Sequence, residues 1–515
     1  MRLLRRVGAV AAVALLAGCA GSTTASTDRT TATTLPHHAP GAGDWPTYGH
    51  DAQHTFHGRT TLTAATAKRL KVAWFFPTSD AVTATPTVVG GTVYVGSWDD
   101  VFYALDLATG RVRWRYHLTP QNGVTPYPGQ KPRDITSDGG LVTSSAWYEA
   151  GNGSRPDLVI FGGGYTLYAL VASTGALYWH HSYPGRPGAP LDPSKDDTRI
   201  FSSPVVVDGK VIFGVDVDGA DGQRGYIAAA DLANGKPVWQ FQTDVDTSGR
   251  VANDGCGSVW SSGTVLPRAG LVVFDTSDCE FGDDEPLAEA IVALHVDSGL
   301  LAWSYHPHHP DVDCDWDFGA TANAGVTPTG DTTFLGVGGK DGTYYSLDPV
   351  TGRPRWSTNV VFGGFAGGFI ATAAYDGRRV YGSTALGDYG RFEKGKTLLC
   401  DASDPRDLGM QEPSVHAFDA STGAIAWQAE HAPSFAPTTV AAGLTFNGPA
   451  LDGSILQVRD AATGALVASV EVPGPIWSGV ATVGNAVVTG IGSSYNARPA
   501  GIAVLTPDGS APVEG

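Results

Sequence analysis

The chain has 515 residues with a formal net charge of −18 at pH 7, and it contains 67 glycines and 13 tryptophans. The acidic balance excludes a nucleic-acid-binding role, because phosphate binding needs a basic surface. Charged residues make up only 16% and hydrophobic residues 42%. Together with the many Gly and Trp, this composition favours an all-β protein with tight turns.

The first element in chain order is a targeting segment. Three arginines within residues 2–6 precede an apolar run, residues 7–18, that is too short to span a bilayer. The run ends in Leu16-Ala17-Gly18-Cys19, which resembles the lipobox of bacterial lipoproteins. That resemblance implies cleavage before Cys19 and acylation of its thiol. An ordinary signal peptide followed by a chance cysteine is the alternative.

The same resemblance sets the domain boundaries that we expect. Residues 1–18 are the signal peptide, and residues 19–43, rich in Ser, Thr, Ala and Pro, form a flexible tether. Residues 44–515 form one folded domain. We expect the protein to be exported and held at the outer face of the bacterial cell membrane, with the lipid anchor as its only membrane contact.

One nonapeptide recurs along the folded part, Asp-x-x-Thr-Gly-x-x-x-Trp, first as residues 106–114. A β run precedes each copy, the Thr-Gly pair favours a hairpin turn, and the following strand ends in Trp. Each unit therefore indicates four short antiparallel strands, which only a closed ring of such units can bury. The other copies, some degenerate, begin at Val171, Asp231, His295, Asp348, Asp419 and Asp460, and the last has Ala468 in place of Trp.

The number of units follows from the segment at residues 70–76. It contains Trp74 and has the pattern of an outer strand without a preceding turn. Strands near residues 481–490 and 501–505 would complete this unit and join the two ends of the domain, which leaves no open sheet edge. The sequence thus predicts an eight-bladed β-propeller of four-stranded antiparallel blades, with seven blades as the alternative.

Four cysteines remain after Cys19. An even number in an exported protein predicts two disulfides, for which three connectivities are open. Of these we favour Cys256–Cys279 and Cys314–Cys400. No Cys-x-x-Cys-His occurs, so no haem of the c type is expected.

The repeat resembles that of the dehydrogenases that use pyrroloquinoline quinone (PQQ). The motif Trp45-Pro46-Thr47-Tyr48-Gly49 resembles the opening of that family. Residues 255–262, 291–307, 313–320 and 338–352 resemble landmarks of its polyvinyl-alcohol-dehydrogenase branch. The resemblance implies an eight-bladed propeller that binds PQQ, together with Ca²⁺ bound by oxygen ligands.

The resemblance also implies roles for individual residues. Trp260 matches the residue that stacks on the quinone, and Lys340 matches the lysine that contacts its oxygens. Asp317 matches the catalytic base, with Asp315 as a close rival, and Asp278 falls where the family places a metal ligand. The alternatives are a packing Trp, an exposed turn Lys, structural Asp residues in a loop, and a solvated acidic loop.

The sequence departs from the family pattern at two places. Ala220 stands where the family has a Glu ligand, so Asp218 and Asp221 are the candidates to replace it. The family's Arg for a PQQ carboxylate has no clear match near residues 139–141. The histidines of residues 306–309 and the neighbouring Asp residues could bind a transition metal, but intervening prolines favour a surface loop.

Two functions follow from these observations. The first is a PQQ- and Ca²⁺-dependent dehydrogenase that oxidises a small or polymeric alcohol at the cell surface and passes electrons to an external acceptor. The second is a non-catalytic lipoprotein that binds an envelope protein, as the related outer-membrane assembly scaffold does. The missing Glu and Arg favour the second function.

Overall fold

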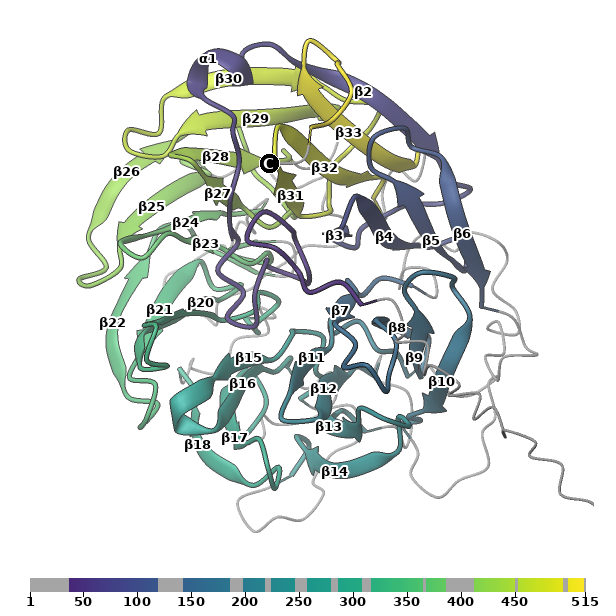
Figure 1. The fold of residues 1–515 in the computed structure, drawn as a ribbon. Helices are drawn as coiled ribbons and strands as arrows, with labels where there is room; N and C mark the ends of the chain where they lie inside the picture. The colour runs from purple at the N-terminus through teal and green to yellow at the C-terminus, as the bar shows by residue number, and fades with distance from the viewer. Residues whose placement is uncertain are drawn as a thin grey trace, which may run out of the picture.

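The computed structural model describes residues 37–118, 142–185, 198–217, 224–245, 257–278, 286–307, 316–364, 367–385, 412–449, 453–493 and 499–513. These residues form eight antiparallel sheets arranged as blades around a central channel (Figure 1). The prediction of an eight-bladed β-propeller is therefore confirmed, and the alternative of seven blades is wrong.

Blades are numbered here in chain order, each from its inner to its outer strand. Blade 1 consists of β3 (Thr87–Val89), β4 (Thr92–Ser97), β5 (Val101–Asp106) and β6 (Val112–His117). Blade 2 consists of β7 (Trp147–Glu149), β8 (Leu158–Gly163), β9 (Thr166–Val171) and β10 (Leu177–Ser182). Blade 3 consists of β11 (Val205–Val207), β12 (Lys210–Val215), β13 (Tyr226–Asp231) and β14 (Pro237–Gln242). Blade 4 consists of β15 (Thr264–Leu266), β16 (Leu271–Asp275), β17 (Ile291–His295) and β18 (Leu301–Tyr305).

The second half of the ring repeats this plan. Blade 5 consists of β19 (Asn323–Val326), β20 (Thr332–Gly338), β21 (Thr343–Leu347) and β22 (Pro354–Asn359). Blade 6 consists of β23 (Ala374–Tyr375), β24 (Arg379–Ser383), β25 (Val415–Asp419) and β26 (Ile425–Ala429). Blade 7 consists of β27 (Thr439–Ala441), β28 (Leu444–Asn447), β29 (Ile455–Asp460) and β30 (Leu466–Glu471). Blade 8 consists of β31 (Val480–Val483), β32 (Ala486–Ile491), β33 (Gly501–Pro507) and β2 (Leu70–Pro77).

The burial of the strands explains their composition. In blade 1, β4 and β5 are buried along almost their whole length, whereas the outer strand β6 alternates exposed and half-buried residues. Middle strands are covered on both faces by the neighbouring blades, so they are apolar throughout, and only the outer strand needs the polar alternation of a solvent-facing edge.

The repeat tryptophans join each blade to the next. The indole N–H of Trp303 in blade 4 donates to the carbonyl of Pro349 in blade 5 at 3.3 Å. The turn glycine of blade 5, Gly352, has φ +68°, and a Cβ there would come within 2.4 Å of the Trp303 ring. The turn thus needs glycine for both its conformation and its close approach. The same indole-to-carbonyl bond is made by Trp74, Trp114, Trp179, Trp239, Trp356 and Trp427.

The interface between blades 7 and 8 lacks this tryptophan, because Ala468 stands in its place. Here a short helix, α1 (Ala64–Ala67), with its N-terminus capped by Thr63, packs against β30. Leu62 and Ala67 join Val470 in one buried apolar cluster. Apolar residues from the start of the domain therefore occupy this interface.

Strand pairing between the two ends closes the ring. β2 pairs antiparallel with β33, from Leu70 opposite Pro507 to Pro77 opposite Gly501. Blade 8 therefore takes its outer strand from the start of the domain and its other strands from the end, as the sequence predicts. The start and the end of the domain therefore cannot separate from each other without breaking this pairing.

Residues 45–58, here called the strap, cross one end of the central channel (Figure 1). The strap bonds to the inner strands of blades on opposite sides of the ring and adds β1 (His57–Gly58) in parallel to β27. This end of the channel is therefore closed by backbone. The main-chain bonds include Trp45 N–H to Val88 O (2.7 Å), Val265 N–H to Ala52 O (2.9 Å), Ala324 N–H to Gln53 O (3.0 Å) and Tyr375 N–H to Thr55 O (2.8 Å).

Several expectations lie outside the described residues. These are the signal peptide, Cys19, most of the tether, and the four cysteines Cys256, Cys279, Cys314 and Cys400. The export, lipidation and disulfide assignments remain predictions. Within the described ranges, no helix is long and apolar enough to cross a membrane.

A buried carboxyl group at the end of β16 gives a prediction about stability. Asp275 is fully buried, and one carboxyl oxygen accepts the N–H of Ala322 at 3.1 Å. Its other oxygen has no hydrogen-bond partner within the described part of the chain. Burial raises the pKa of Asp275 well above its ordinary value of 3.8. As the pH rises above 3.8, the unfolded state therefore releases this proton before the folded state does.

We expect an Asp275→Asn variant to be more stable than the parent protein at pH 7.5, by about 1–3 kcal/mol. A raised pKa contributes stability below the unfolded pKa and loses it as the pH rises, so the difference between variant and parent should vanish toward pH 4. Denaturant unfolding at both pH values measures this.

Asp106→Asn is the matched control, since hydrogen bonds from Arg113 and Thr109 lower the pKa of Asp106. That variant should instead be the less stable protein at pH 7.5. A stability gain of Asp275→Asn that does not change with pH would contradict the assignment.

Candidate functional site

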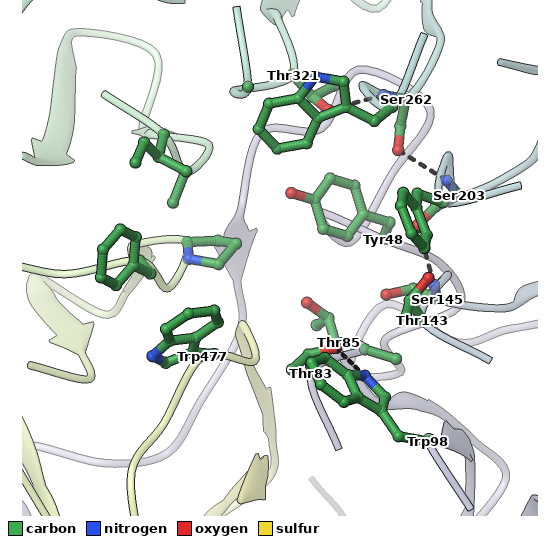
Figure 2. A pocket seen from close by; sticks show the side chains of 18 residues that line it. Tyr48, Thr83, Thr85, Trp98, Thr143, Ser145, Ser203, Ser262, Thr321 and Trp477 are labelled. Carbon is green, nitrogen blue, oxygen red and sulfur yellow. Dashed lines mark hydrogen bonds between the residues drawn. The ribbon is translucent and has the colours of Figure 1, made fainter. Parts of the chain in front are cut away.

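The walls of the channel are built in layers, because alternate residues of each inner segment face the channel. One layer consists of hydroxyl side chains, most of which accept a main-chain N–H from the preceding blade. Several of these side chains are labelled in Figure 2. We call Thr85, Ser145, Ser203, Ser262, Thr321 and Thr372 the hydroxyl girdle. The bonds are Ser145 N–H to Ser203 Oγ (3.0 Å), Ser203 N–H to Ser262 Oγ (2.9 Å), Ser262 N–H to Thr321 Oγ1 (2.9 Å), Thr321 N–H to Thr372 Oγ1 (3.0 Å) and Gly479 N–H to Thr85 Oγ1 (3.1 Å).

The girdle fixes how the blades align along the channel. Residues two positions before the girdle form the next layer, which includes Phe201, Trp260 and Gly319. The Trp260 indole lies against blade 5, where a Cβ on Gly319 would come within 2.2 Å of its ring. The strap contacts the blades three residues beyond the girdle on its other side, at Val265 and Ala324. The Trp260 layer is therefore farther from the strap than the girdle is.

A cavity of about 500 Å³ lies between the Trp260 layer and the strap. We call it the chamber. Tyr48 enters it from the strap (Figure 2). Its hydroxyl bonds Thr372 Oγ1 at 2.9 Å. The ring of His54 lies between the carbonyl oxygens of Tyr48 (2.8 Å) and Gly263 (2.9 Å), which anchors Tyr48 to blade 4. Burial raises the pKa of Tyr48 to about 12, so its phenol stays protonated.

Two of the residues singled out from the sequence, Asp317 and Lys340, lie together on the other side of the Trp260 layer, next to Trp260 itself. Asp317 stands two residues before Gly319, and its carboxylate lies 2.6 Å from the Lys340 ammonium. That ammonium is 5.4 Å from the centroid of the Trp260 ring. Asp317 is 1% exposed and Lys340 is 7% exposed, so both charges are shielded from bulk water. The structure brings an indole face, a cation and a carboxylate to one place.

A tight turn after β20 positions Lys340. Asp341 stabilises the turn by accepting the N–H of Thr343 (2.9 Å) and the hydroxyl of Tyr345 (2.6 Å). The Lys340 N–H donates to the carbonyl of Asp317 at 2.9 Å. A Cβ on Gly363 would come within 1.5 Å of the Lys340 carbonyl oxygen, so the backbone packs there without space for a side chain. Lys340 does belong to a turn, but its side chain is buried rather than solvated.

The proposed metal ligands are less complete. Asp278 is half-buried, and its carbonyl accepts the N–H of Gly257 at 3.0 Å, next to Ser258, so it lies at the same end of the channel as Asp317. Asp218, Asp221 and the rival base Asp315 lie outside the described residues. Within the described ranges, no cluster of three His, Cys, Asp or Glu side chains could hold a metal ion. The cation site thus stays a prediction.

Arg199 is a candidate that the sequence reasoning missed. It stands two residues before Phe201, as Asp317 stands two before Gly319, and so it occupies the same layer in blade 3. Arg199 is 5% exposed, and its guanidinium lies 5.6 Å from the Phe201 ring. The family pattern places its anion-binding Arg in blade 2, where this sequence has no clear match. The spacing from Arg199 to the girdle residue Ser203, which equals that from Asp317 to Thr321, is the signal that could have found it.

This arrangement agrees with a comparison of the whole sequence with known protein families. The family described as the β-propeller domain of glucose, ethanol and alcohol dehydrogenases, named for PQQ, matches residues 45–361, more than half of the chain. The chain belongs to this family. Its members' propeller architecture is the one described above.

Individual relatives are more distant. A polyvinylalcohol dehydrogenase from Pseudomonas sp. is 25% identical over 346 residues, which cover 62% of this chain and 51% of the relative. A quinohemoprotein alcohol dehydrogenase from Comamonas testosteroni is 28% identical over 312 residues, covering 54% of this chain and 40% of the relative. The chain spans about half the length of the curated relatives it matches.

Among solved structures, the quinohemoprotein alcohol dehydrogenase ADHIIG from Pseudomonas putida HK5 superposes with a TM-score of 0.70 at 19% identity. The match covers 92% of this chain and 81% of that structure. At this identity the likeness supports the shared fold.

Proposed function

We propose that this chain is a PQQ-dependent dehydrogenase that oxidises alcohols. The contact among Trp260, Lys340 and Asp317 in the channel carries the proposal, since a quinone dehydrogenase needs an aromatic surface, a cation and a base side by side. Membership of the dehydrogenase family supports it. In this proposal the reaction takes place outside the cell membrane, where the segment ending at Cys19 would anchor the protein.

The residues present fit a flat, tricarboxylated quinone. The Trp260 face would hold the ring system by stacking. Lys340 and Arg199, both nearly buried and on the same side of the Trp260 layer, would hold the quinone oxygens and a carboxylate. Arg199 thus supplies the charge that the sequence comparison found missing in blade 2. Asp278 would take part in holding Ca²⁺.

The protein's own contribution to the reaction is positioning and proton transfer. When bound, the quinone supplies the acceptor for the two electrons of the alcohol. The Asp317 carboxylate takes the proton of the alcohol hydroxyl, and the ion pair with Lys340 fixes its orientation. Because Asp317 is 1% exposed, bulk water does not compete for this proton. An external acceptor must then remove the electrons from the quinone.

A titration of the purified full chain with PQQ and Ca²⁺ tests the proposal. We expect saturable quenching of tryptophan fluorescence, followed by reduction of an electron-accepting dye when ethanol or polyvinyl alcohol is added. A Lys340→Met variant should bind PQQ at least about tenfold more weakly, because a charge-assisted contact is lost.

Lys210→Met is the matched control, since Lys210 of blade 3 pairs with the exposed Asp297 of blade 4, outside the site. The melting temperature of each variant shows whether it is folded. If the parent protein neither binds PQQ nor reduces the dye, the proposal fails. Co-purification of an envelope protein in that case would favour the scaffold function.

A further inference from the structure

The chamber is distinct from the place where Trp260, Lys340 and Asp317 meet. The strap closes it at one end, and the Trp260 layer separates it from Asp317 at the other. Its volume of about 500 Å³ lies within the range of small-molecule sites, roughly 300–1,000 Å³. None of the described residues that line it carries a charge. The function proposed above uses Trp260 as a shared wall and leaves the chamber without a role.

The girdle hydroxyls present hydrogen-bonding groups to the chamber. Ser203 and Ser262 each accept one main-chain N–H from the preceding blade. A hydroxyl has two lone pairs and one hydrogen, so each keeps one lone pair and the hydrogen for another partner. Neither side chain donates a hydrogen bond to any other described residue. Each can therefore both donate to and accept from a molecule in the chamber.

Aromatic side chains form a large part of the remaining wall. Trp98, Trp260, Trp477, Phe201 and Phe435 all line the chamber. The rings of Phe435 and Trp477 pack against each other with centroids 4.7 Å apart. Apolar ring faces above a belt of hydroxyls suit a molecule that has C–H faces and several hydroxyl groups. A charged ligand would be buried there without a described counter-charge, which is costly.

We propose that the chamber binds a neutral polyhydroxylated molecule of about monosaccharide size. The strap closes one end of the chamber, so the ligand enters through the Trp260 layer while no quinone is bound. Its ring carbons pack on the indoles, and its hydroxyls exchange hydrogen bonds with the girdle and with the phenol of Tyr48. This site requires no quinone, so it stands independently of the dehydrogenase function.

Fluorescence titration and calorimetry of the quinone-free full chain with D-glucose test the proposal, with gluconate as the charged probe. We expect saturable binding of glucose in the millimolar range and weaker binding of gluconate. Ala371→Phe, which places a ring into the chamber from its wall, should abolish glucose binding. Thr143→Val, which keeps the shape of a lining side chain but removes its hydroxyl, should weaken binding about fivefold.

Thr445→Val is the matched control, because Thr445 is buried in blade 7 away from the chamber. It should leave glucose binding unchanged, as should Lys340→Met, which impairs only the proposed quinone site. Absence of saturable glucose binding at high millimolar concentration would overturn the proposal. Glucose binding that survives both Ala371→Phe and Thr143→Val in folded protein would overturn it as well, since the sugar would then bind elsewhere. The proposal would also be overturned if Ala371→Phe blocked PQQ binding as strongly as Lys340→Met does, because the chamber would then be the quinone site.

Discussion

Replacing Asp317 by asparagine is expected to lower alcohol turnover of the PQQ-loaded protein by about 100- to 10,000-fold, the range that a positioned base contributes. Asparagine keeps the size of the side chain and a group that Lys340 can contact, but it cannot take the proton of the alcohol. The affinity for PQQ should change far less than turnover, because Trp260, Lys340 and Arg199 remain. Dye reduction at saturating alcohol and PQQ titration of the same preparation measure the two quantities.

Asp348→Asn provides the control for this experiment. Asp348 pairs with Arg355 at 3.0 Å on the surface of blade 5, outside the channel. Its substitution should leave both turnover and PQQ affinity unchanged. If Asp317→Asn retains turnover close to that of the parent protein, Asp317 is not the base, and Asp315 becomes the first candidate.

Truncating a repeat tryptophan is the second change with a large expected effect. Trp303→Ala should lower the free energy of unfolding by about 3–5 kcal/mol, because it opens a void at the interface of blades 4 and 5 and removes the bond to Pro349. Trp303→Phe keeps most of the packing and loses only the N–H donor, so its loss should be about 1 kcal/mol. Denaturant unfolding followed by far-ultraviolet circular dichroism gives these values.

The Trp98→Ala variant distinguishes the stability that comes from blade docking from the stability lost on removing any large aromatic residue. Trp98 lines the chamber and bonds Thr83 within its own blade at 2.9 Å. It already faces empty space on one side, so its truncation should cost much less than that of Trp303. Equal losses in the two variants would mean that the repeat tryptophans do not join the blades.

The elements that could be predicted were those with a local pattern. The Thr-Gly turn and the Trp of each repeat are set by short-range spacing, and they predicted both the hairpins and the number of blades. The pairing of β2 with β33 followed from the need to complete the unit that contains Trp74. The substitute for the missing tryptophan, by contrast, came from Leu62 and α1, because an interface can be filled by any apolar residues that reach it.

The candidate site was predictable only in part. The resemblance to the dehydrogenase family singled out Trp260, Lys340 and Asp317. Their contact depends on the turn after β20 in blade 5, which folds Lys340 back onto Asp317. It also depends on the preceding blade, blade 4, which supplies Trp260. Arg199 was missed because its spacing to Ser203 becomes informative only when blades 3 and 5 are aligned, which puts it in the Asp317 layer.

The sequence by itself thus determined the repeat, the eight blades and the way the ring closes, because each of these depends on residues close together in the chain or on counting a recurring motif. The tertiary structure alone decided the hydroxyl girdle, the strap across the channel and the chamber between them. Each blade contributes only one residue to a layer. The side chains of a layer therefore come together only when all eight blades are aligned around the channel.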